Sequence, residues 1–446
     1  MSRYPFVPKT TTHLAPGQIW SIPMSDGRFG CGRVLRIDRD RAYGARVLFT
    51  GAVLDWVGDR PPTPEAIAGL GALAIGVAHV RSIGVNGGEI VGERALELDP
   101  IEVTDRPSTH WGTNFPVWRA ERRFIHGDPP PKTDFRHVRS PLTDEMLRPS
   151  TTGRGVVQFD SLLTDDDFVR LAEWLRAYPE ITLRAYGGYD GSIRDLEFLR
   201  SFPSLRRFAA DALWDKLGSI EGLRHLPDDL EELGLGATRR PLDVSGLARF
   251  RQLRSLFLEG PVRGIEVVSG LTEIDDLTFR SITLPDLSLL LPLRRLRSFD
   301  LKLGGTKDLA LLPRIGEIRY LELWMIKGLT DIRPIGGMTE LRSLFLQALR
   351  GVEELPDLSR CIRLRRVRLE TMKGLRSLAP LATAPALRDV VLVDLRQLAA
   401  EDVTPLAGLP GLRGVSLGLG SIRKNEAARR LLGLPDVKTA DDWRDD

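Results

Sequence analysis

The hexapeptide LRSLFL occurs twice in the chain, at residues 253–258 and at residues 341–346. Hexapeptides with apolar residues at the first, fourth and sixth positions recur, and they begin at residues 205, 230, 253, 274, 296, 318, 341, 364, 387 and 412, the first being the poorest copy. These starts lie about 23 residues apart on average, and a fixed period of this size is the signature of stacked repeats. The sequence therefore predicts a repeat architecture over roughly its C-terminal two thirds.

A second pattern leads into the hexapeptides, with apolar residues at every third position. Leu329, Ile332, Ile335 and Met338, for example, lead into Leu341. Side chains at positions i and i+3 lie on one face of a 3₁₀ turn. Each unit is therefore predicted to be one short strand and one tight helical turn. Stacked units would form a curved solenoid with parallel strands on the concave face and 3₁₀ or short helical turns on the convex face.

This pattern resembles the leucine-rich-repeat proteins, in particular the bacterial short-repeat types, over roughly residues 180 to 435. The usual repeat places Asn or Cys three residues after the last strand leucine, but Asn425 is the only asparagine after residue 150. The polar groups of the turns must then find water or backbone partners. We therefore expect a less regular solenoid. The resemblance implies a fold and no particular ligand.

The ends of the solenoid have candidate caps. Residues 155–159 (GVVQF) read as a strand, and the segment after Thr164 reads as an amphipathic helix with Thr164 as its N-cap. A short helix from Asn425 is predicted to stop at Gly433. The repeat domain with its caps is predicted to span residues 151–440.

The intervening positions of each repeat strand are predicted to face the concave surface, because strand side chains alternate. Phe257 and Phe345 lie four strands apart, which is roughly 20 Å at about 4.8 Å per strand. Exposed aromatic residues beside arginines and carboxylates are typical of protein-binding surfaces, and packing against the other domain is the alternative. The residues predicted to bind a partner are Phe257, Asp300, Tyr320, Glu322, Trp324, Phe345, Arg366 and Arg368.

The first 127 residues lack the repeat and are predicted to form a small, mostly β domain. The segments from Pro16 and from Gly30 read as two strands joined by a turn at Asp26 and Gly27, and a third strand begins at Ala45. Residues 128–150 have the proline-rich, polar character of a linker. The predicted fold is therefore multidomain, with a mostly β N-terminal domain followed by the repeat solenoid.

The N-terminal hairpin resembles the opening of the immunity protein 26 family of bacterial polymorphic toxin systems. In that family a strand ending in Ile-Pro meets a glycine-rich strand ending in Gly-Arg-Val-Leu. The resemblance implies a non-enzymatic immunity protein whose partner is a toxin domain, bound through the β domain, the repeats or both, with no catalytic residues. The residues that carry it are Gly17, Ile19, Ile22, Pro23, Asp26, Gly27, Phe29, Gly30, Gly32, Arg33 and Val34.

Two other functions stay open. A leucine-rich-repeat scaffold or signalling adaptor would have no toxin partner. The same hairpin also resembles the start of small-barrel endoribonuclease toxins, but there the corresponding strand contains Arg-Pro, whereas Arg33 is followed by Val34. The six histidines have no metal-ligand spacing, and no HExxH, CxxC, Walker or GxSxG motif occurs. The sequence thus predicts neither a cofactor nor a metal.

Composition indicates a cytoplasmic protein. Of 446 residues, 42% are hydrophobic and 28% charged, and the start of the chain lacks an apolar stretch of signal-peptide length. The net charge of +3 comes from dispersed arginines with carboxylates close by, which argues against nucleic acid. No membrane association is expected, and the sequence does not predict the oligomeric state. Cys361 falls in the apolar register and is expected to be buried, whereas the role of Cys31 is open.

Overall fold

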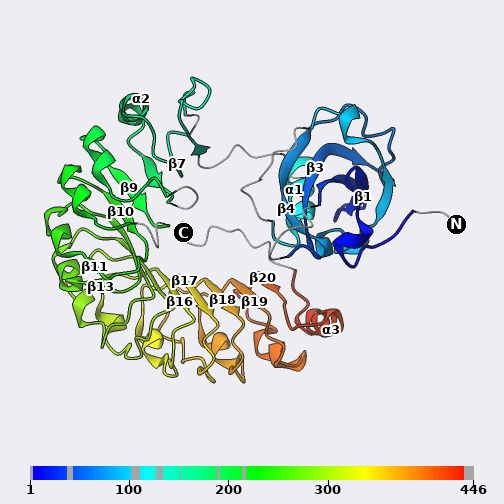
Figure 1. Cartoon of the computed structure of the whole chain (residues 1–446). Coiled ribbons are helices and arrows are strands. Elements are labelled where there is room, and N and C mark those ends of the chain that lie inside the picture. Colours follow the sequence, from blue (N-terminus) through cyan, green and yellow to red (C-terminus); the bar gives the residue numbers. More distant parts are fainter. Residues whose placement is uncertain are drawn as a thin grey trace. The chain divides into compact units, whose positions relative to one another are not determined.

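The chain forms two compact units, Met1–Pro131 and Lys132–Asp446, which are described separately. Figure 1 shows the elements of both units in the computed structural model. The structure describes residues 4–37, 44–101, 111–125, 127, 134–150, 152–187, 191–212 and 217–435.

The first unit is built on a five-stranded antiparallel sheet with the strand order β4-β3-β2-β1-β5. The strands are β1 (Gln18–Pro23), β2 (Phe29–Arg36), β3 (Leu48–Gly58), β4 (Ala72–His79) and β5 (Ile90–Glu93). Helix α1 (Phe115–Phe124) packs on β1, β2 and β3. The short 3₁₀ helices are η1 (Thr11–His13), η2 (Val80–Ser82), η3 (Val85–Gly87) and η4 (Leu96–Leu98). The predicted mostly β domain and its third strand are confirmed.

The β1–β2 hairpin has the predicted turn, with Gly27 in a left-handed conformation at φ 86°. Trp20 pairs with Gly32 across the hairpin, and a Cβ atom on Gly32 would collide with the Trp20 indole ring. Two buried clusters lie on the sheet, one including Trp20 and Val34 and the other including Cys31. The glycine-rich character of β2 therefore makes room for a buried tryptophan.

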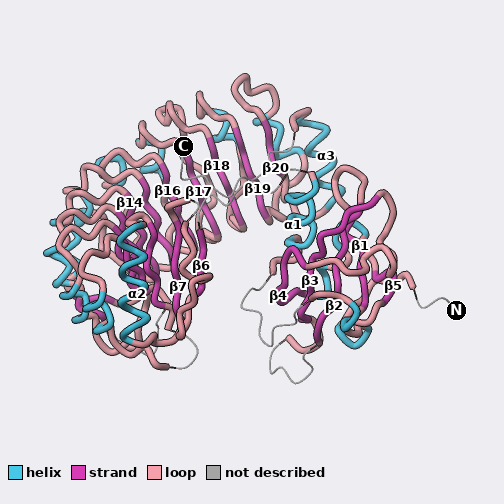
Figure 2. The backbone as a smooth tube through the Cα atoms, turned by 90° about the horizontal axis from the view of Figure 1, so that it is seen from above, coloured by secondary structure: helices cyan, strands magenta, loops and turns pink. Residues whose placement is uncertain are grey.

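The second unit is a leucine-rich-repeat solenoid. Thirteen of its fifteen described strands form one sheet in which consecutive repeats are neighbours (Figure 2). The pairs along this sheet run parallel. The strands are β6 (Asp134–His137), β7 (Gly155–Phe159), β8 (Ile181–Ala185), β9 (Arg207–Ala210), β10 (Glu232–Leu235), β12 (Ser255–Glu259), β14 (Asp276–Arg280), β15 (Ser298–Lys302), β16 (Tyr320–Trp324), β17 (Ser343–Gln347), β18 (Arg366–Glu370), β19 (Asp389–Val393) and β20 (Gly414–Ser416). The predicted fold class is confirmed.

Short helices and a small second sheet complete the repeats, and they lie along the outer side of the arc of strands (Figure 1). The 3₁₀ helices are η5 (Glu197–Ser201), η6 (Glu221–His225), η7 (Ser245–Arg249), η8 (Ile265–Gly270), η9 (Ser288–Leu290), η10 (Leu312–Arg314), η11 (Arg333–Gly337), η12 (Ala379–Thr383) and η13 (Glu401–Leu406). Strands β11 (Leu242–Asp243) and β13 (Val262–Arg263) form the small sheet. The repeat leucines fill one continuous core between these helices and the long sheet.

Both predicted caps are present. Helix α2 (Asp165–Ala177) begins after Thr164, whose side chain accepts a hydrogen bond from the Asp167 N–H at 3.2 Å. Helix α3 (Ile422–Leu432) begins three residues earlier than predicted, because Ser421 caps it, and it ends at Gly433 in a left-handed conformation.

The predicted linker over residues 128–150 is wrong for residues 134–150. Strand β6 pairs with β7, and Val138 and Leu142 are buried in the repeat core. Arg136 also donates to the carbonyl oxygens of Met146, Arg148 and Pro149. The prolines and polar residues of this segment therefore belong to the cap of the solenoid, and its residues 128–133 lie outside the described part of the chain.

The prediction of a less regular solenoid is also wrong for β12 to β19, which pair residue for residue without a shift. The first residue after each strand has a left-handed backbone, and its N–H can donate to the next strand, as Ala348 does to the Glu370 carbonyl at 2.9 Å. Backbone partners thus replace the missing asparagines, as expected. The left-handed residues are Ser281, Leu303, Met325, Ala348, Thr371 and Asp394, with φ between 51° and 59°.

Replacing Ala348 with glycine is expected to stabilise the repeat unit by about 0.5–1 kcal/mol, because glycine adopts a left-handed backbone without the steric cost of a Cβ atom. Ala310, which is exposed and not left-handed, provides the control, and Ala310→Gly is expected to be neutral or destabilising. Chemical denaturation of both variants measures the difference. A lower stability for Ala348→Gly than for Ala310→Gly would contradict the backbone argument.

Candidate functional site

The register of the long sheet places the predicted partner-binding residues on one face, in three rows. The first row contains Tyr320 and Arg366, the central row Phe257, Asp300, Glu322, Phe345 and Arg368, and the third row Trp324. Phe257 and Phe345 are separated by four strand-to-strand steps, as predicted. The face formed by the first, third and fifth residues of the strands β12 to β19 is called the concave face below.

Burial divides the eight predicted residues into two groups. Phe257, Trp324, Phe345, Arg366 and Arg368 are partly exposed. Asp300, Tyr320 and Glu322 are buried, with exposed fractions of 0%, 7% and 6%. The expectation that these three are available to a partner is therefore wrong in this structure, and they form the floor of the concave face.

A lysine explains why these polar groups are buried. The Lys302 Nζ lies 3.0 Å from Asp300 Oδ2 and 2.9 Å from Glu322 Oε2. The Tyr320 hydroxyl donates to Glu322 at 3.1 Å, and the Thr278 hydroxyl donates to Asp300 at 3.3 Å. Buried carboxylates need this kind of charged and hydrogen-bonded environment. Sequence reasoning did not single out Lys302, although it follows Asp300 by two residues in the same strand.

Two of the three partly exposed aromatic rings, Trp324 and Phe345, lie beside an arginine. The Arg280 guanidinium is 5.6 Å from the centre of the Trp324 ring, and it also pairs with Glu259 at 3.2 Å. The Arg368 guanidinium is 4.7 Å from the centre of the Phe345 ring, within cation–π range.

Arg368 also pairs with Glu370 at 2.7 Å, and Glu370 accepts from the Gln347 amide at 2.9 Å. These contacts restrict the rotation of the rings and of the arginines. They preorganise a surface of the kind that lowers the entropic cost of protein binding.

Phe257 lies apart from this group. Its neighbours in the central row are Gly234 on β10 and Thr278 on β14. Between Phe257 and Phe345 the central row contains Thr278, Asp300 and Glu322, which are all buried. The concave face is thus a polar floor with a half-buried phenylalanine on each side, and Trp324 stands on the strand next to Phe345.

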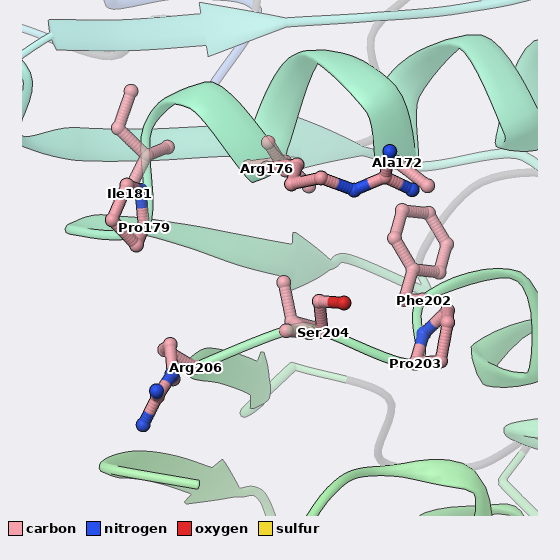
Figure 3. A pocket seen from close by; sticks show the side chains of 10 residues that line it. Ala172, Arg176, Pro179, Ile181, Phe202, Pro203, Ser204 and Arg206 are labelled. Carbon is pink, nitrogen blue, oxygen red and sulfur yellow. The ribbon is translucent and has the colours of Figure 1, made fainter.

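Two hollows of the repeat unit do not form a second candidate site. The cleft in Figure 3 lies between α2 and the turn after η5 and is lined by Arg176, Phe202 and Arg206 among others. Its volume of about 20 Å³ suits a single water molecule. A depression of about 400 Å³ lies between η6 and η7 on the helical side, but its Arg249 is already paired with Asp228. Neither hollow combines catalytic groups.

Both cysteines are buried. Burial raises the pKa of the Cys31 thiol far above its usual range, and it raises the pKa of Cys361 to about 11. A thiol with a raised pKa is a poor nucleophile. Cys361 is the buried thiol that was predicted, and Cys31 is a core residue of the first unit. Among the described residues, no cluster of His, Cys, Asp or Glu is suited to a metal ion.

Arg33 lies where the hairpin departs from the Arg-Pro pattern of the nucleases, and its surroundings give it a structural role. Its guanidinium lies 2.5 Å from Asp99 and donates to the carbonyl oxygens of Arg94 and Ala95 at 2.8 Å. Both side chains of the Arg33–Asp99 pair are fully buried. Arg33 therefore ties β2 to the segment after β5 and is not available to a phosphate group.

The sequence of the first unit is similar to one known family. Residues 15–110 match the family model of immunity protein 26. The immunity protein 26 region thus covers the five-stranded sheet and ends before α1. No curated protein matches the chain.

Several solved structures are similar to the chain. An internalin (inlF) from Listeria monocytogenes is 19% identical, with 67% of this chain and 89% of that chain covered and a TM-score of 0.42. Internalin C2 from the same species is 17% identical, with 55% and 83% covered and a TM-score of 0.28. A leucine-rich-repeat protein from Leptospira interrogans is 13% identical, with 63% and 93% covered and a TM-score of 0.32.

Within the described segments, no helix is both long enough and apolar enough to span a membrane.

Proposed function

We propose that the chain is a bacterial immunity protein that neutralises a cognate polymorphic toxin by protein–protein binding, without catalysis. The observation that carries the proposal is the match of residues 15–110 to the immunity protein 26 family. The proposal places the protein in the cytoplasm, where it would protect the cell that makes the toxin.

The repeat unit gives this proposal a binding surface. A concave face with Trp324 and Phe345 beside paired arginines has the composition of protein-binding hot spots. The proposed partner-binding residues are therefore Phe257, Trp324, Phe345, Arg366 and Arg368 as contacts, with Asp300, Tyr320 and Glu322 supporting them. The alternative function, a repeat scaffold without a toxin, would use the same face.

A toxicity-rescue assay separates the two functions. A bacterial host expresses the toxin encoded beside this chain, with or without the full chain, and with residues 1–131 or 132–446 alone. The immunity proposal expects the full chain to restore growth. Growth arrest despite normal accumulation of the full chain would favour the scaffold. The two fragments show which unit contributes to protection.

A further inference from the structure

Six consecutive repeats have an arginine at the same position, just before the strand. These residues are linked through the backbone, because the N–H of every member after the first donates to the carbonyl oxygen of the preceding arginine at 2.6–2.8 Å. We call this row the arginine ladder, and it consists of Arg297, Arg319, Arg342, Arg365, Arg388 and Arg413.

Several exposed arginines of the repeats have a carboxylate partner, as Arg363, Arg376 and Arg396 do, but four members of the ladder do not. Arg319 lies 3.6 Å from Glu317. Burial and the neighbouring Asp276 raise the pKa of Asp275, and the charges of Arg254, Arg297 and Arg207 offset only part of that rise. For Arg342, Arg365, Arg388 and Arg413, no ion pair or side-chain hydrogen bond to any described residue exists. These four guanidinium groups are exposed or half-exposed.

The nearest charges do not compensate the ladder. On one side Arg363 is already paired with Glu340, and on the other Arg366 is paired with Asp389 at 3.5 Å. Neighbouring strands are about 4.8 Å apart, so like charges stand directly beside one another along this edge. Such a row costs stability in the free protein and creates a strong local positive potential. A partner with carboxylates in a row would relieve this repulsion.

The surroundings of the ladder favour a protein over a nucleic acid. Surfaces that bind single-stranded nucleic acid combine a groove of one sign with aromatic faces on which bases stack. Here Trp324 and Phe345 are already covered by guanidinium groups on one side. Asp389 on the adjacent first row and Glu370 on the third row interrupt the positive charge. The planar guanidinium fork matches a carboxylate in two parallel hydrogen bonds.

We propose that the arginine ladder is the docking edge for an acidic polypeptide surface, and that the central concave face contacts the rest of the same partner. This inference deepens the proposed function by giving the toxin an acidic patch. It also accounts for an immunity protein with a net positive charge, because complementarity to an acidic partner requires the basic edge.

The probe for this edge is a fluorescein-labelled decaglutamate peptide, titrated with the full chain at low ionic strength and followed by fluorescence anisotropy. A ten-nucleotide oligothymidylate of similar charge is titrated in parallel. The test variant is Arg342→Gln/Arg365→Gln/Arg388→Gln. The matched control removes the same charge from exposed arginines that are paired with Asp228, Asp331 and Glu353, and it is Arg249→Gln/Arg333→Gln/Arg376→Gln.

The ladder variant is expected to bind decaglutamate at least about tenfold more weakly than the unchanged chain. The affinity of the control variant for the same peptide should change by less than about threefold. The thermal midpoint of the ladder variant in low salt is expected to equal or exceed that of the unchanged chain, because repulsion between the arginines is removed. The same samples thus show whether the variant is folded. Replacement of the same three arginines by lysine keeps the charge but removes the guanidinium fork, so the affinity should fall less than in the glutamine variant.

Absence of decaglutamate binding, or an equal loss in both variants, would overturn the inference. Tighter binding of the oligothymidylate, with the same loss in the ladder variant, would overturn it in favour of a nucleic-acid surface. The titration uses no toxin, so its failure is distinguishable from failure of the rescue assay.

Discussion

Asp99→Asn is expected to destabilise the first unit by about 3–5 kcal/mol, the usual cost of removing one partner of a buried ion pair. Asp99 pairs with Arg33 at 2.5 Å and with Arg94 at 3.0 Å, and it accepts from the Gly69 N–H at 2.7 Å. An asparagine of the same size leaves the buried Arg33 charge without its counterion. The rate of amide hydrogen exchange of residues 18–36 in the full chain measures this loss of stability.

The contribution of Asp99 to the stability of the first unit depends on pH, and the sign of this dependence follows from its pKa. Burial by itself would raise the pKa of Asp99, but the hydrogen bonds from Gly69, Arg33 and Arg94 outweigh burial and hold the pKa below its usual value. The stabilisation is therefore fully present above the ordinary carboxyl pKa of about 3.9 and is lost as the pH falls through the lower folded-state value. The difference between the unchanged chain and Asp99→Asn should accordingly shrink in acid.

Arg123→Gln is the control for this prediction. Arg123 pairs with Asp55 at 3.1 Å, but both side chains are about 40% exposed, and exposed pairs contribute less than about 1 kcal/mol. Equal exchange rates in the two variants would show that the buried pair does not hold β2 to the segment after β5.

Trp324→Ala is expected to weaken binding of the toxin by about 2 kcal/mol, or roughly thirtyfold, the size of a hot-spot truncation. The ring is partly exposed beside Arg280, and the neighbouring strand contributes Phe345. Its removal also frees Arg280 from the ring, but Arg280 keeps Glu259 as a partner. The thermal midpoint should consequently change little. Isothermal titration with the toxin domain measures the affinity.

Ile362→Ala is the matched control, because Ile362 is 58% exposed and precedes β18 outside the concave face. It should bind the toxin like the unchanged chain. Unchanged affinity for Trp324→Ala, or an equal loss for Ile362→Ala, would place the binding surface elsewhere on the chain.

Most of the repeat fold could be predicted because its pattern is local. The leucines of L-x-x-L-x-L determine which strand positions are buried, and they placed Phe257 and Phe345 on one face four strands apart. The thiol of Cys361 and the caps at Thr164 and Gly433 follow from the same short-range rules. The N-terminal hairpin was predictable from its Asp-Gly turn.

What the sequence did not reveal depends on contacts across strands. Alternation correctly turned Asp300, Tyr320 and Glu322 toward the concave face, but their burial follows from Lys302 reaching two strands at once. The left-handed turns carry residues such as Leu303 and Ala348, which have no preference for that conformation. Residues 134–150 have the composition of a linker, and only the pairing of β6 with β7 shows that they belong to the repeat unit.

The sequence also did not reveal which arginines of the ladder are paired in space. Its arginines were visible as Leu-Arg at the start of successive hexapeptides. Along the sequence all of them except Arg413 have a carboxylate nearby, which suggested a mixed-charge surface. In space those carboxylates pair with other arginines, such as Glu340 with Arg363, and leave Arg342 and Arg365 exposed without partners among the described residues.

The most direct test of the immunity proposal is a titration of the purified toxin domain with the purified full chain while the toxin's activity is recorded. The proposal expects activity to fall linearly and to vanish at a simple stoichiometric ratio, with the complex recovered intact by size-exclusion chromatography. Full toxin activity in the presence of excess folded chain would contradict it.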